Sequence, residues 1–126
     1  MGEHQLSFFS EVDEREVRRI VGRELKQYKA LRVSMQNKQE REAAGINLLF
    51  PSLQEWDLEK ELKVKQMDRA LNILDEIESQ IITRKYLSSG RVKDINLYLD
   101  MGLTKDQYYS IKKQAIFQIA SALGIV

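Results

Sequence analysis

The chain has 126 residues, of which 43% are hydrophobic and 31% charged, and its formal net charge is +1. Its single proline and six glycines favour a helical fold, and the absence of cysteine excludes disulfides, zinc–thiolate sites and thiol chemistry. No apolar run approaches the roughly 20 residues of a membrane-spanning helix, so we expect no membrane association and a cytoplasmic location. The length suits one domain, or one small domain with an extension.

Residues 1–10 are predicted to form a short tail that contains His4, the one histidine of the chain. Without a second imidazole or a neighbouring nucleophile, this residue cannot build a catalytic triad or a histidine metal site. The acidic residues elsewhere lie on predicted helix exteriors, which offer no pocket for acid–base chemistry. We therefore predict no catalytic residue, no metal site, no cofactor and no enzymatic activity.

Residues 11–44 are predicted to form one long helix. Apolar residues recur there at spacings of three and four, which indicates a single buried stripe: Val17, Val21, Leu25, Tyr28, Leu31 and Met35. The stripe could pack on the C-terminal part of the chain or on a second copy of the protein. The basic residues on its flanks alternate with acids, which favours a solvated face over a phosphate-binding surface.

The segment 45–56, GINLLFPSLQEW, is unusually apolar for a connection. We expect it to pack between the long helix and the C-terminal part, because an exposed apolar patch of this size would be a binding surface. In that second case Phe50 and Trp56 are the candidate interface residues. Residues 1–52 are thus predicted to be a tail, a long helix and an apolar linker that serve as a packing or dimerisation element.

A helical pattern resumes at Asp57 and runs to about Tyr86, as one helix or as two with a bend. Its predicted buried stripe consists of Met67, Ala70, Leu71, Leu74, Ile77 and Ile81. Residues 45–83 contain four basic and eight acidic residues, whereas residues 84–126 contain seven basic and three acidic ones. This asymmetry would attract phosphates to the C-terminal end.

The pattern within residues 92–123 is that of a short helix, a turn and a longer helix, which is typical of a helix-turn-helix. Gly102 can leave the first helix in a left-handed conformation, and Thr104 is placed to cap the second. The predicted buried face of that second helix contains Tyr108, Ile111, Ala115, Ile119 and Leu123. Phe117 lies on the opposite side, so we predict that the second half of the helix packs there on the N-terminal helix or on a partner chain, or that the helix bends.

The runs IITRKYLSS and INLYLDMGLTKDQYYSIKKQAIFQIASALG resemble the ArpU family of phage transcriptional regulators, which is itself similar to region four of bacterial sigma factors. About the last sixty residues carry the resemblance, with a weaker echo in LSFFSEVD and LKQYKAL. It implies an all-α protein whose residues 53–126 form a DNA-binding domain and which regulates phage or prophage genes, often late ones, inside a bacterial host. One position departs from the sigma pattern, because Tyr98 stands where the first helix usually has a small residue.

Aligned on Gly102, Thr104 and Ala115, the resemblance assigns the base-reading positions to Lys105, Asp106, Tyr109 and Ser110. Such a mixture of amine, carboxylate, ring and hydroxyl suits the donors, acceptors and methyl groups of a major groove. The residues predicted to contact phosphates are Arg91, Lys93, Thr104, Gln107, Lys112 and Lys113.

The expected partner is double-stranded DNA. Because one helix-turn-helix rarely gives enough contact area for a specific operator, a homodimer or a contact with RNA polymerase is also expected. Two alternatives remain open at this point. The chain could be a protein-interaction adaptor or anti-repressor, or it could be the DNA-recognition small subunit of a packaging enzyme, for which a ring-shaped oligomer would be the sign.

Overall fold

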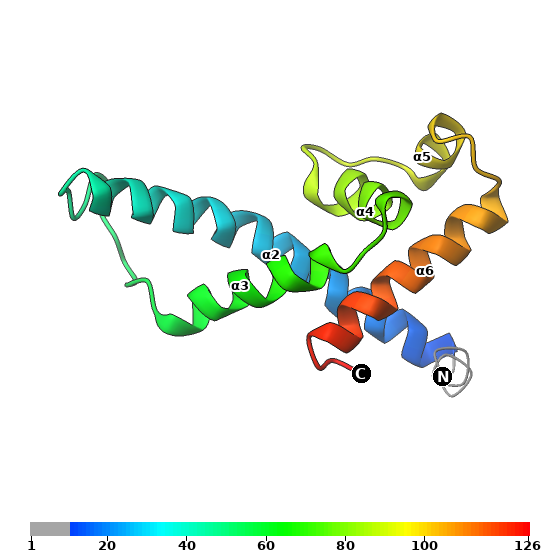
Figure 1. The fold of residues 1–126 in the computed structure, drawn as a ribbon, viewed down its shortest axis with the longest axis horizontal. Coiled ribbons are helices and arrows are strands. Elements are labelled where there is room, and N and C mark those ends of the chain that lie inside the picture. The colour runs from blue at the N-terminus through cyan, green and yellow to red at the C-terminus, as the bar shows by residue number, and fades with distance from the viewer. Residues whose placement is uncertain (1–10) are drawn as a thin grey trace.

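The computed structural model describes residues 11–126, and every regular element in this range is a helix (Figure 1). The elements in chain order are α2 (Glu11–Ala43), α3 (Leu58–Asn72), α4 (Glu76–Ile82), the π-helix η1 (Thr83–Leu87), α5 (Asp94–Asp100) and α6 (Lys105–Ala122). The all-α prediction is confirmed for this part of the chain, and the predicted tail lies outside it. None of the helices described here has the length and apolar character needed to cross a membrane.

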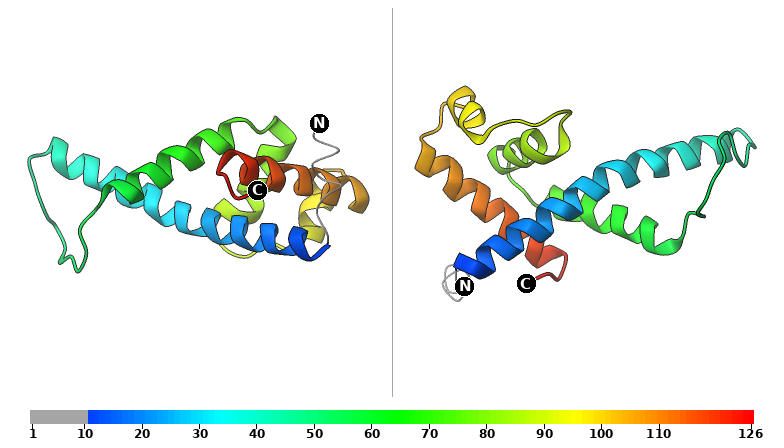
Figure 2. Two further views of the ribbon diagram at one scale, coloured as in Figure 1. Left: turned by 90° about the horizontal axis from the view of Figure 1, so that it is seen from below. Right: turned by 180° about the vertical axis from the view of Figure 1, so that it is seen from behind.

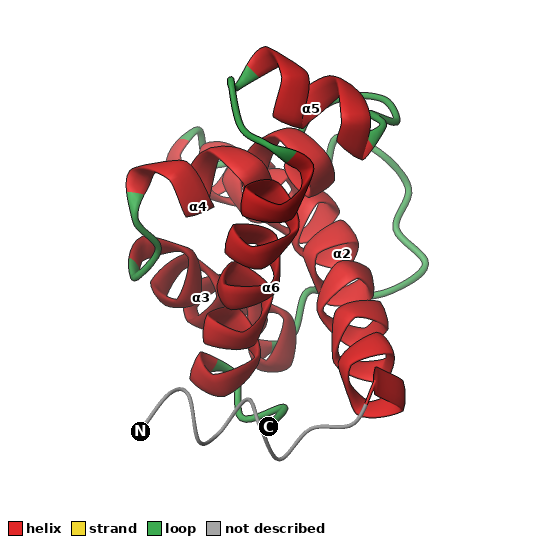
Figure 3. Ribbon diagram, turned by 90° about the vertical axis from the view of Figure 1, so that its right-hand side faces the viewer, coloured by secondary structure: helices red, strands yellow, loops and turns green. Residues whose placement is uncertain are grey.

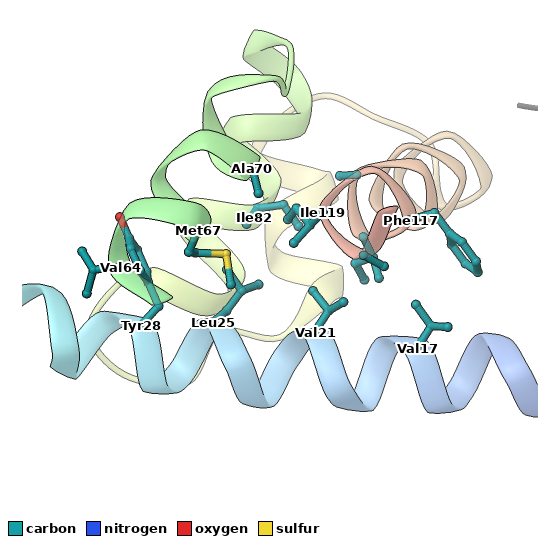
Figure 4. Close-up of a cluster of buried hydrophobic side chains, with 13 residues drawn as sticks. Val17, Val21, Leu25, Tyr28, Val64, Met67, Ala70, Ile82, Phe117 and Ile119 are labelled. Atoms are coloured by element: carbon teal, nitrogen blue, oxygen red, sulfur yellow. The ribbon is translucent and has the colours of Figure 1, made fainter. Parts of the chain in front are cut away.

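Helix α2 matches the predicted long helix to within one residue. Four residues of its apolar stripe are buried, namely Val17, Val21, Leu25 and Tyr28. Their partners are in the same chain, because these side chains belong to one core cluster with residues of α3, α4 and α6 (Figure 4). In Figure 3, α6 lies between α3 and α2. Helix α2 therefore packs in cis as part of the main core.

The predicted helix from Asp57 to Tyr86 is interrupted after Asn72, which answers the question that the sequence left open. Asp75 starts α4 with a capping box: its carboxylate accepts the Glu78 N–H at 2.8 Å, and the Glu78 carboxylate accepts the Asp75 N–H at 3.0 Å. The new start shifts the helical register, so the prediction that Ile77 is buried was wrong, and this side chain is 46% exposed.

The turn between α5 and α6 forms as its residues predict. Gly102 has φ 69°, a left-handed value that other residues adopt only at a cost. The Leu103 N–H donates to the Tyr98 carbonyl at 2.9 Å, and the Gly102 N–H donates to the Leu99 carbonyl at 3.3 Å, the two bonds of a Schellman motif. The chain thus leaves α5 in a fixed direction.

A second, smaller core cluster joins α4, α5 and α6 through Ile81, Leu97 and Tyr108. Tyr98 packs against this cluster, and its ring centroid lies 5.7 Å from that of Tyr108 with the planes tilted by 51°. A tilted pair of rings at this distance is attractive. The contact between α5 and α6 therefore includes an aromatic pair.

The connection between α2 and α3 corrects a prediction. The two helices diverge toward it (Figures 1 and 2), and the apolar loop, residues 45–56, joins their separated ends. Five large apolar side chains are exposed there by 40 to 102%: Ile46, Leu48, Leu49, Phe50 and Leu53. Only Trp56 packs against the main core as expected. The loop is a largely exposed apolar surface.

Candidate nucleic-acid interface

The four residues predicted to read bases are all exposed on the first two turns of α6: Lys105, Asp106, Tyr109 and Ser110. Residues spaced by three and four share a face of a helix, so these side chains present one surface. The Tyr109 ring stands edge-on to the buried Tyr108 ring, with centroids 5.3 Å apart. The four predicted base-reading residues are called the reading surface below, and one of them, Tyr109, is held against a ring of the core.

A capping box fixes the start of α6. The Thr104 hydroxyl accepts the Gln107 N–H at 3.1 Å, and the Gln107 side-chain oxygen accepts the Thr104 N–H at 3.0 Å. Both residues were predicted to contact phosphates, and both are exposed. In the structure, these side-chain oxygens order the first turn of α6, which carries the predicted base-reading residues.

Arg91 and Lys93 are exposed in the loop that precedes α5. They lie on the N-terminal side of the short helix and Thr104 on its C-terminal side, so exposed polar residues flank α5 at both ends. Both cations are accessible to solvent, and their phosphate contacts stay a prediction.

Lys112 is a correction to the predicted phosphate-binding set, because its side chain is inside the protein. The residue is 7% exposed, and its Nζ donates to Asp94 Oδ1 at 3.0 Å. The Tyr108 hydroxyl donates to the same oxygen at 2.5 Å, and Lys85 Nζ lies 3.6 Å from it. Asp94 thereby joins α5 to α6 and to η1.

Aromatic rings enclose the buried ammonium of Lys112. Its Nζ lies 5.8 to 5.9 Å from the ring centroids of Tyr86, Tyr108 and Tyr109, a range in which ring faces attract cations. Burial lowers the pKa of Lys112 from its ordinary value, against the opposing effect of Asp94. Burial alone would raise the pKa of Asp94, but the hydrogen bonds from Tyr108 and Lys112 hold it below its ordinary value.

Lys113 is also engaged within the chain. Its Nζ lies 2.6 Å from Glu14 Oε1 on α2, in a pair whose side chains are 43% and 26% exposed. This ion pair ties the start of α2 to the middle of α6, while 43% of the Lys113 side chain stays exposed, so its predicted phosphate contact stays a prediction. Glu14 and Lys113 are about a hundred positions apart in the sequence, so no local sequence pattern predicts their pairing.

The three predicted interface residues have different environments. Phe50 is 77% exposed, Trp56 is half-buried against the main core, and Phe117 is 7% exposed. Phe117 packs on α2 near Val17 (Figure 4), which confirms the predicted packing contact and identifies its partner as the N-terminal helix. Of the three, Phe50 alone offers most of its side chain to another molecule.

Among the described residues there is no group of three or more acidic or histidine side chains placed to hold a metal ion. A comparison of the chain with protein-family models, curated proteins and solved structures gives no match.

Proposed function

We propose that this chain is a sequence-specific DNA-binding regulator of transcription and that α5 and α6 are its helix-turn-helix. The observation that carries the proposal is the exposure of an amine, a carboxylate, a ring and a hydroxyl on the first two turns of α6, a helix that is anchored in the core by Ala115, Phe117 and Ile119. The ArpU resemblance supplies the setting, which is the control of phage or prophage genes, late genes among them, in the cytoplasm of a bacterial host.

In this proposal the start of α6 enters the major groove. The Lys105 ammonium suits the guanine O6 and N7 acceptors, the Asp106 carboxylate suits the cytosine amino group, and the Tyr109 ring suits a thymine methyl group. Each good base contact would contribute roughly 1–3 kcal/mol of discrimination. Arg91 and Lys93 would bind phosphates and make the affinity depend on salt.

The test is binding of the purified protein to labelled duplexes from the DNA upstream of its own and neighbouring genes, measured by fluorescence anisotropy at several salt concentrations. We expect one fragment to be preferred, with affinity that falls as salt rises. The double variant Lys105→Ala, Tyr109→Ala should lose about 30-fold or more of the preference, because two base contacts are removed.

Lys65→Ala provides the matched control, because Lys65 is an exposed lysine on α3 and should leave the preference unchanged. If no fragment is preferred and the double variant binds like the wild type, α5 and α6 only support the fold. The regulator proposal would then be wrong.

The exposed apolar loop favours a second candidate function, protein interaction. Five exposed large apolar side chains close together in sequence are more than a monomeric surface usually carries. Within the regulator proposal the loop is where two copies meet, which would supply the second recognition helix that an operator requires. In the alternative the loop binds another protein, such as RNA polymerase, and the chain acts as an adaptor or anti-repressor.

Oligomeric mass separates these roles. We expect a dimer by sedimentation equilibrium, and we expect Phe50→Ser, Leu53→Ser to shift it toward monomer, because both side chains are more than three-quarters exposed. The pair Ile73→Ser, Ile77→Ser removes exposed apolar surface elsewhere and should leave the mass unchanged. A ring would favour the packaging subunit, and a wild type that is monomeric at every concentration would favour the adaptor.

A further inference from the structure

Helix α2 packs on one flank of the second half of α6 and lies beside its reading surface. Ile116 and Phe117 of α6 are buried in the same cluster as Val17 and Val21 of α2, and the two helices cross in the view from behind (Figure 2). Helix α2 therefore covers the flank of α6 that carries Phe117, whereas Gln114 and Ser121 stay exposed on the second half of the helix. Next to this covered flank, the first turns of α2 lie beside Tyr109 of the reading surface.

A cleft of about 390 Å³ lies between these two helices. Its lining includes Arg18 from α2, together with Tyr109 and Lys113 from α6. Tyr109 thus belongs both to the reading surface and to the cleft, and the cleft opens beside the place where α6 would meet bases. The DNA backbone next to those bases would therefore lie close to the cleft.

The charges within the cleft single out Arg18. Lys113 is paired with Glu14, and the Nζ of Lys112 is held by Asp94, so in each of these pairs a carboxylate offsets the lysine charge. Arg18 is exposed. It lines the cleft together with Tyr109.

A guanidinium suits this position. Its planar fork of donors can take two phosphate oxygens at once, and it remains charged under all physiological conditions. Such a contact fixes the register of a protein on DNA without reading sequence. A single arginine at the edge of the reading surface would therefore orient α6 in the groove.

We infer that Arg18 in the cleft between α2 and α6 binds a phosphate of the DNA backbone next to the bases that α6 reads. This inference rests on the proposed function and extends the DNA interface to the N-terminal helix. The sequence does not predict this role for Arg18, because acidic and basic residues alternate along α2 and favour a solvated face. It becomes visible only when the fold brings Arg18 and Tyr109 to one cleft.

The experiment compares wild type, Arg18→Ala and Arg18→Lys on the preferred duplex and on an unrelated duplex, across several salt concentrations. One lost phosphate contact lowers the slope of log affinity against log salt by about 0.9, which corresponds to about an eightfold loss of affinity at 0.1 M salt. We expect that loss for Arg18→Ala on both duplexes, with the preference between them unchanged. Arg18→Lys should keep most of the slope because the charge remains.

The matched control is Arg69→Ala, which removes an exposed arginine at the end of α3 and should bind like the wild type. The inference is overturned if Arg18→Ala keeps the wild-type slope and affinity, or if it changes the sequence preference while the slope stays the same. In either case the regulator proposal still stands. If the wild type shows no salt-dependent DNA binding, both are wrong, and the two failures are distinguished in this way.

Discussion

Replacing Asp94 with alanine is expected to destabilise the protein by about 3 kcal/mol. The variant leaves the Lys112 ammonium, in a residue only 7% exposed, without its carboxylate, and breaking a buried pair in this way costs about 3–5 kcal/mol. It also removes the acceptor of the buried Tyr108 hydroxyl. We place the expected loss at the lower end because Asp94 itself is partly exposed.

The measurement is urea unfolding followed by circular dichroism, with Asp100→Ala as the control. Asp100 lies on the same helix, but its ion pair with Arg84 has side chains 62% and 41% exposed, and such a pair contributes about 0–1 kcal/mol. Similar losses in the two variants would contradict the role assigned to Asp94. Lys112→Met should cost less than Asp94→Ala, because the remaining carboxylate keeps Tyr108 and Lys85 as partners.

The same carboxylate gives stability a dependence on pH. Burial would raise the pKa of Asp94, yet its hydrogen bonds keep that pKa below the ordinary value in the folded protein. Its stabilising contribution is therefore complete at neutral pH and is lost as the pH falls through the lowered pKa. Asp94→Ala should show a weaker loss of stability in acid than the wild type.

Replacing Leu25 with alanine is expected to cost about 3 kcal/mol of the free energy of unfolding. Leu25 is fully buried in the main core, and its truncation removes apolar contacts and leaves a cavity, for which the usual range is about 2–5 kcal/mol. The loss should appear as a lower denaturation midpoint for the whole protein, because α2 shares this core with α3, α4 and α6.

Val33→Ala is the control on the same helix, because Val33 is 53% exposed and its truncation should change stability by no more than about 0.5 kcal/mol. If Leu25→Ala unfolds α2 in a separate, earlier transition, α2 is an appendage rather than part of the main core. A single shifted transition would agree with the packing described here.

Local features of the fold were predictable from the sequence. The stripe of α2, the left-handed Gly102 and the Thr104 cap each depend on residues within a few positions of one another, so spacing and residue type are sufficient to predict them. The interruption before Asp75 was also signalled, because Asp75 and Glu78 have the spacing of a capping box. A single apolar stripe continued through this interruption predicts, wrongly, that Ile77 is buried.

The distant pairings were not predictable. Asp94 reaches Lys112 only because the turn at Gly102 folds α5 onto α6, and Glu14 reaches Lys113 only because α2 crosses α6. From the sequence alone, both lysines are therefore predicted to be unpaired cations on the surface. The prediction that the apolar loop is buried was wrong for a different reason. Its composition favours burial, but α2 and α3 diverge toward the loop and leave Phe50 exposed to solvent.

If α6 reads DNA as proposed, the short run of predicted base-reading residues limits how much sequence information one copy can extract. The reading surface extends from Lys105 to Ser110, about 9 Å of helix at 1.5 Å per residue, and the duplex advances 3.4 Å per base pair. One copy thus faces about three base pairs, or roughly 6 bits, whereas picking one site among about a million competitors requires roughly 20 bits. The missing information has to come from repeated sites, from DNA shape or from a partner that makes its own promoter contacts.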